Sequence, residues 1–195
     1  VNKKCWISFT KVKKKNTLFV EDKYMDCYDD TNCIWVDIFP LDGVKDKMSK
    51  FQLWQKKVFD RLYTLITIKN GSNYYQNSKV KKYVYKFLLA IIPVRFLIFL
   101  LEKVVSFHDE DKVKYLCSFS TVYSIDKDTF DKEKLLPYEE VVFEEKKFMG
   151  VKGYDYYLKK LYGDYMKLPP VSKRVNHDPY LVKFEDGEII NFKDK

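Results

Sequence analysis

The sequence predicts an α+β fold, because segments with strand periodicity and segments with helix periodicity occupy different parts of the chain. Short β-branched and aromatic segments lie near both ends, and apolar residues at helical spacing fill the middle. The 195 residues are enough for one full hydrophobic core. We therefore expect a single domain with a β section over 1–44, a helical section over 45–120 and an α/β section over 121–195.

Three strands are predicted in the N-terminal section. Two of them, 6–12 and 17–21, flank a lysine-rich turn at Asn16. The third lies in the run Ile34-Trp35-Val36-Asp37-Ile38-Phe39-Pro40-Leu41-Asp42-Gly43, where Pro40 ends the strand because it lacks the backbone N–H that a β-ladder needs.

A carboxylate inside this apolar run is costly. Side chains alternate between the two faces of a strand, so Asp37 shares its face with Trp35 and Phe39. An ionised carboxylate that leaves water must be compensated by a cation or by strong hydrogen bonds. Two alternatives follow for Asp37: a metal ligand among core residues in a cleft, or a residue on a half-solvated edge strand.

Two long helices are predicted next. Apolar residues recur at helical spacing over 45–69, and a second helical stretch covers 79–107. Its centre, 87–101, is apolar except for Arg95, but it is shorter than the roughly 20 residues that cross a bilayer, and Pro93 and Arg95 both oppose insertion. We expect this helix to pack on the first one, with contact to a membrane surface as the alternative.

The C-terminal section combines short elements. The sequence predicts a short helix near 109–116, a strand over 141–148, a helix over 154–162 that Gly163 ends, and a hairpin over 180–192 around Asp186-Gly187.

The charge balance favours anionic partners. The 36 Lys and Arg residues outnumber the 28 Asp and Glu residues, giving a net charge of +8. Most lysines lie in mixed runs without the glycine-aromatic pattern of an RNA-binding sheet, so no nucleic-acid partner is expected. The four cysteines show no metal-binding spacing and no secretory signal opens the chain, which favours a cytoplasmic location.

Several motifs occur in a fixed order along the chain. They are Asn16–Glu21, Val36–Gly43, Gly153–Leu158, Tyr162–Met166 and Leu168–Pro170, followed by Lys173, Arg174 and His177. Their order and separation resemble the LicD family of phosphotransferases, which share a nucleotidyltransferase-like catalytic domain with fukutin and fukutin-related protein. The resemblance covers about 9–177 and implies a mixed sheet with a helical insertion and a helical C-terminal part.

The resemblance implies an activity and its ligands. LicD-type enzymes use Mg²⁺ or Mn²⁺ to move phosphorylcholine or a related substituted phosphate from a CDP-linked donor, such as CDP-choline, to a hydroxyl of a glycan or lipid-linked glycan such as lipopolysaccharide or teichoic acid. This implies a cytoplasmic enzyme, free or peripheral at the inner membrane face. Asp37 matches the third acid of the family's site, as metal ligand or general base. Lys173, Arg174 and His177 are the expected substrate-binding residues.

One hallmark of the family is missing from these 195 residues. The family's Gly and Arg before an Asp-x-Asp strand have no counterpart ahead of Asn16, and the two similar triplets, 109–111 and 126–128, are predicted to be solvated helix starts or loops. We therefore expect an N-terminally incomplete chain that is inactive alone, with a non-catalytic nucleotide- or partner-binding fragment as the alternative. His108 is expected to cap a helix, and Asp42 to form a turn.

Overall fold

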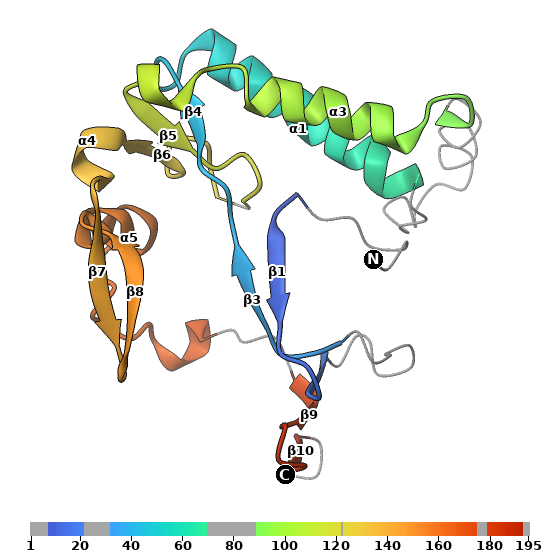
Figure 1. The fold of residues 1–195 in the computed structure, drawn as a ribbon, viewed down its shortest axis with the longest axis vertical. Helices are drawn as coiled ribbons and strands as arrows, with labels where there is room; N and C mark the ends of the chain where they lie inside the picture. The colour runs from blue at the N-terminus through green and yellow to red at the C-terminus, as the bar shows by residue number, and fades with distance from the viewer. Residues whose placement is uncertain (1–7, 22–31, 70–88, 122, 175–178, 193–195) are drawn as a thin grey trace. The chain divides into compact units, whose positions relative to one another are not determined.

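The chain mixes helices with small antiparallel sheets, which confirms the α+β class. The structure, a computed structural model, describes residues 8–21, 32–69, 89–121, 123–174 and 179–192 (Figure 1). These residues group into two compact units. The first, which we call the helical unit, comprises 1–8 and 39–165, and the second, the strand unit, comprises 9–38 and 166–195.

The helical unit contains two antiparallel sheets and most of the helices. One sheet has the order β4-β5-β6, and the other is the β7–β8 hairpin. The described elements of the helical unit are β4 (Asp42–Val44), α1 (Lys50–Lys69), α3 (Val94–Val105), the 3-10 turn η2 (Glu110–Lys112), β5 (Tyr115–Cys117), β6 (Thr129–Asp131), α4 (Lys132–Leu135), β7 (Tyr138–Phe143), β8 (Lys146–Val151) and α5 (Tyr154–Tyr162).

The sheet β4-β5-β6 separates two hydrophobic cores within the helical unit. Because side chains alternate along β5, Cys117 joins the core formed with α1 and α3, whereas Leu116 joins the core formed with α4 and α5. Phe59, Leu62 and Leu97 are fully buried members of the first core. Both layers of helices are therefore positioned by one short strand.

Helix α1 begins later than predicted and buries a different face in its first turns. Ser49 accepts a hydrogen bond from the Gln52 backbone N–H at 3.1 Å, which is the usual N-cap contact. Gln52 and Gln55 are completely buried, while Phe51 and Trp54, expected in the core, are exposed. The first two turns therefore contradict the apolar face predicted from spacing.

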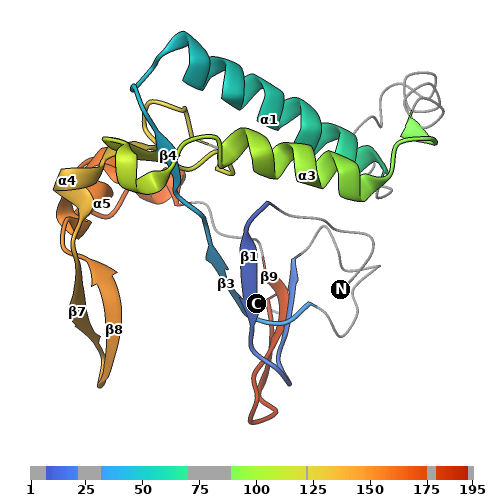
Figure 2. The same ribbon diagram turned by 45° about the horizontal axis from the view of Figure 1, so that its top comes forward.

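Helix α3 packs along α1, as predicted (Figures 1 and 2). It begins at Val94, with Pro93 at the N-cap position, so the proline precedes this helix instead of bending it; residues 79–88 lie outside the described part of the chain. Arg95 is exposed. Among the described residues, no helix is long and apolar enough to cross a membrane.

The strand unit contains two small antiparallel sheets. Its elements are β1 (Thr10–Lys13), β2 (Leu18–Glu21), β3 (Trp35–Ile38), the 3-10 turn η3 (Val171–Lys173), β9 (Pro179–Lys183) and β10 (Ile189–Asn191). The turn between β1 and β2 forms with Asn16 at a φ of 59°, yet the two strands do not pair. Instead β1 pairs with β3 (Figure 2), and β2 pairs with β9 of the predicted C-terminal hairpin.

Local sequence signals explain which C-terminal elements match their predictions. Helix α5 has the predicted bounds, and Gly163 ends it with a φ of 71°, which glycine adopts without strain. The prediction of one continuous strand over 141–148 is wrong only at its centre: 141–143 lie in β7 and 146–148 in β8, and the turn of the hairpin separates them. The turn predicted at Asp42 is also wrong, since Asp42 pairs with Cys117 across β4 and β5.

We predict that Gly153→Ala destabilises the protein more than Gly163→Ala. A Cβ at Gly153 would meet the Lys134 carbonyl oxygen at 1.9 Å, a backbone contact that cannot yield without moving α4. We expect a loss of about 2 kcal/mol or more in the free energy of unfolding. At Gly163, where the added Cβ meets nothing within 4 Å, only the positive φ is unfavourable and the loss should be about 1 kcal/mol. Urea unfolding of both variants measures the difference, and equal losses would contradict the contact.

Candidate functional site

Asp37 lies on β3 opposite Lys11 of β1. The two residues are register partners, and the Lys11 ammonium lies 3.2 Å from Asp37 Oδ1. Both side chains are about three-quarters buried, with exposed fractions of 26% for Lys11 and 29% for Asp37. The Lys11 ammonium also lies 4.2 Å from the centre of the Trp35 ring, within cation–π range. Lys11 therefore supplies the cation that the sequence required beside Asp37.

The other face of the β1–β3 ribbon is solvent-exposed. Val12 and Val36, which pair across the strands, are 54% and 66% exposed, and Ile38 is 52% exposed. Phe39, which shares the face of Asp37, is 41% exposed as well, so the prediction that Asp37 lies among core residues is wrong. Asp37 instead matches the half-solvated edge strand, because both strands of a two-stranded ribbon are edges.

The described residues do not fit a Mg²⁺ or Mn²⁺ site. No group of three His, Cys, Asp or Glu side chains that would hold a metal occurs in the described part of the chain. The one predicted ligand, Asp37, directs its buried oxygen at a lysine ammonium, which a metal cation would have to displace. No step of the chemistry can be derived through a metal from these residues.

The predicted phosphate-binding residues lie after the Pro169-Pro170 bend. Lys173 ends the turn η3, and the exposed Arg174 follows it; Arg174 Nε donates a hydrogen bond to the Pro169 carbonyl at 2.9 Å. This bond fixes the base of the guanidinium to the bend. His177 lies outside the described residues. Arg174 belongs to the strand unit, as does Asp37.

The motifs Gly153–Leu158 and Tyr162–Met166 have structural roles in the helical unit. Tyr157 stacks on the buried Phe130 with ring centres 4.7 Å apart, and Tyr156 accepts a hydrogen bond from the Asp131 backbone N–H at 3.1 Å. Tyr165 donates a hydrogen bond to Asp155 at 3.0 Å. The contacts of Tyr156 and Tyr157 attach α5 to β6, and that of Tyr165 attaches the following turn to α5, which explains the aromatic residues at these positions.

The two Asp-x-Asp triplets differ from each other. Asp109 caps η2 by accepting from the Asp111 backbone N–H at 3.1 Å, which confirms the predicted solvated helix start. Asp126 pairs with Lys47 at 2.9 Å, but Asp128 is only 2% exposed and accepts a hydrogen bond from Thr121. The prediction of a solvated loop is therefore wrong at Asp128. Burial raises the pKa of this carboxyl.

Asp42 is the second acid of the Asp-Ile-Phe-Pro-Leu-Asp-Gly run and belongs to the helical unit. Burial, and to a smaller extent the nearby Glu110 carboxylate, raise the pKa of its carboxyl from 3.8 to about 6. A carboxyl with a pKa near neutrality can donate or accept a proton at physiological pH. This property could not be predicted from the sequence, because Glu110 approaches Asp42 only through the fold.

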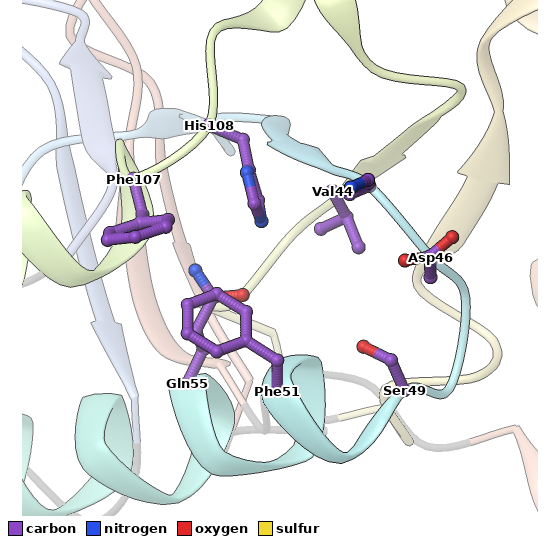
Figure 3. A pocket seen from close by; sticks show the side chains of 8 residues that line it. Val44, Asp46, Ser49, Phe51, Gln55, Phe107 and His108 are labelled. Carbon is purple, nitrogen blue, oxygen red and sulfur yellow. The ribbon is translucent and has the colours of Figure 1, made fainter.

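A pocket of about 240 Å³ opens beside the start of α1 (Figure 3). His108, predicted as a helix cap, lines it and contacts the rings of Phe51 and Phe107, at 5.5 Å and 5.1 Å between ring centres. The cap of η2 is instead Asp109. Gln55 also lines the pocket; its Nε2 donates to the Val104 carbonyl at 2.7 Å, and its buried Oε1 has no hydrogen-bond partner among the described residues.

Comparisons with protein-family models, curated proteins and solved structures gave no match to this chain. The geometry of the described residues and the sequence motifs are therefore the basis for the function proposed below.

We predict that Lys11 and Asp37 stabilise each other. Because both side chains are largely buried, removing one leaves a charge without its partner, and a double-mutant cycle with Lys11→Met and Asp37→Asn should give a coupling of about 1 kcal/mol. The matched control is Lys14 with Glu185, an ion pair of the same unit in which both side chains are more than half exposed. A coupling for Lys11 and Asp37 no larger than that control would show that the pair is not stabilising.

We predict that Asp42 makes stability fall as the pH rises. Its folded-state pKa of about 6 lies above the ordinary 3.8, so between these values the folded protein binds more protons than the unfolded chain. The free energy of unfolding should decline across this window by up to about 3 kcal/mol from this group. Asn at this position stays neutral, so the stability advantage of Asp42→Asn over the wild type should grow between about pH 4 and pH 7 in urea unfolding. A difference that does not change with pH would contradict the raised pKa.

Proposed function

We propose that this chain is part of a LicD-type phosphotransferase with a nucleotidyltransferase-like fold, which moves phosphorylcholine or a related substituted phosphate from a CDP-linked donor to a glycan hydroxyl. The observation that carries the proposal is the Asp-Ile-Phe-Pro-Leu-Asp-Gly run, followed in order by the Tyr-Gly-Asp-Tyr-Met and Pro-Pro motifs. What supports it in the structure is the position of the first carboxylate of the run: Asp37 lies on the short strand β3 with 29% of its side chain exposed.

The proposal assigns roles only to residues of this chain. Asp37 accepts the proton of the attacking hydroxyl, for which a carboxylate exposed on one side is suited. Arg174, with its Nε held by Pro169, presents the rest of its guanidinium to the donor's phosphates; Lys173 adds positive charge after the same bend, and His177 adds a hydrogen bond to phosphate or sugar. The metal that the family uses enters no step of this proposal, since the described residues do not form its ligand set.

A non-catalytic binding fragment is the second candidate. The Lys11–Asp37 ion pair favours it, because a carboxylate already paired with an ammonium is a weaker base and a poorer metal ligand. On this view the basic residues after the Pro-Pro bend still bind an anionic ligand, and no transfer follows.

We predict that the 195-residue chain binds CDP-choline without turning it over, and that Arg174→Ala weakens the binding. Charge-assisted hydrogen bonds to phosphate make the expected loss about tenfold. Calorimetry measures binding, and Lys183→Ala, at an exposed lysine of β9 in the same unit, is the control. Unchanged binding in the Arg174 variant would remove Arg174 from the site, and steady CMP release with Mg²⁺ and a glycan acceptor would show that the chain already carries a complete catalytic centre.

The transfer reaction itself is tested on the natural protein, with any residues that precede Val1 retained. Asp37→Asn keeps the shape of the side chain and removes its charge, so we expect it to abolish CMP release while the far-UV circular dichroism and the binding of CDP-choline stay close to wild type. Asp60→Asn, which removes an exposed acid of α1 that is also paired with a lysine, is the control and should leave the rate unchanged. Turnover that survives in Asp37→Asn would show that another residue is the base, whereas a wild-type protein that binds CDP-choline but releases no CMP would favour the binding fragment.

A further inference from the structure

The outer face of α3 is aromatic and basic. Leu97 and Leu101 are buried against α1, so the helix is fixed with its opposite side outward. Helical spacing places the exposed residues of α3 on that single side: Arg95, Phe96, Phe99, Glu102 and Lys103. Phe96 and Phe99 are each about half exposed, which is unusual for neighbouring phenylalanines on a water-facing helix.

Exposed aromatic rings extend beyond the end of α3. The Lys103 ammonium lies 5.6 Å from the centre of the Phe99 ring. After the helix, Phe107 is 63% exposed and contacts Phe51 of α1, with ring centres 5.0 Å apart; Phe51 in turn stacks on Trp54, which is 52% exposed. We call Phe96, Phe99, Phe107, Phe51 and Trp54 the aromatic row.

We propose that the aromatic row docks the helical unit on an anionic membrane surface, with α3 lying in the plane of the interface. Tryptophan and phenylalanine rings partition into the boundary between headgroups and acyl chains, and the long side chains of Arg95 and Lys103 reach lipid phosphates from the same face. The one acid of the face, Glu102, leaves it net positive, as is the whole chain. This charge favours anionic lipid over neutral lipid.

This inference is independent of the proposed function. The surface is formed by α1 and α3 of the helical unit, whereas Asp37 and Arg174 belong to the strand unit. The exposed face of α3 is a consequence of the predicted packing of α3 on α1. One side of this apolar helix is buried by α1, and the described residues leave the other side exposed. The two alternatives drawn from the sequence, burial and membrane-surface contact, thus apply to opposite sides of one helix.

Vesicle flotation with the 195-residue chain tests the proposal. We expect binding to phosphatidylcholine vesicles in which about a third of the lipid is phosphatidylglycerol, and weak binding to phosphatidylcholine alone. Phe96→Ala with Phe99→Ala should weaken binding by about tenfold or more. Arg95→Gln with Lys103→Gln should remove the preference for anionic vesicles. Circular dichroism melting confirms that each variant folds.

The matched control is Phe143→Ala with Phe148→Ala on the β7–β8 hairpin, where the rings are 67% and 50% exposed but no basic helix face accompanies them. This control should bind anionic vesicles like the wild type. An equal loss in control and row variants, equal binding to both kinds of vesicle, or no vesicle binding would overturn the proposal. A fourth outcome would also overturn it. If the chain self-associates in gel filtration, binds no vesicles, and becomes monomeric in the Phe96 and Phe99 variant, the aromatic row joins two copies of the chain.

A position-specific measurement accompanies the flotation. Brominated acyl chains quench tryptophan fluorescence only at close range, so anionic vesicles made from such lipid should quench the emission of Trp54. The Trp54→Phe variant keeps an aromatic ring and should lose most of the quenching while it still floats with the vesicles. Quenching that is the same in this variant would place another tryptophan at the membrane and contradict the proposed orientation.

Discussion

The helical unit depends on β5, a strand of three residues whose two faces belong to different cores. Leu116 packs with Phe130, Leu135 and Leu161, whereas Cys117 packs with α1 and α3. The backbone bonds to β4 and β6 hold both side chains in these positions at once. A shift of register by one residue would place Cys117 in the α5 core and Leu116 beneath α1, so this small sheet determines where both layers of helices lie.

Polar contacts join α1 to that sheet, and they explain why spacing alone gave the wrong face. Gln52 donates a hydrogen bond to Thr129 of β6 and accepts one from the Met48 backbone N–H, while Gln55 donates to the last turn of α3. Two amides can be buried here because these partners satisfy most of their polar atoms. A pattern of apolar residues assigns glutamines to water, since the partners that make burial favourable are distant in sequence.

The elements that could be predicted from the sequence are those with a signal inside the element itself. Gly163 ends α5 and Asp186-Gly187 turns the C-terminal hairpin, because a positive φ requires such residues wherever the chain goes next. Strand partners carry no such local signal. Thus β1 pairs with β3 and not with β2, and the short strand β5 lay unnoticed where a helix was expected. The position of Asp37 on a strand was predictable, but its neighbour Lys11 was not.

The ion pair decides what Asp37 can do in this chain. An ammonium 3.2 Å from the carboxylate compensates the charge on the strand, which is the role the sequence analysis gave to a metal or to strong hydrogen bonds. A phosphotransferase that uses Asp37 as a base must therefore weaken this pair as substrate binds. The phosphates of a donor are the natural competitor, because they attract the Lys11 ammonium by the same charge. If Asp37 is the base of such a reaction, Lys11 would hold it in the resting protein and turn to the phosphates of the donor as the donor binds.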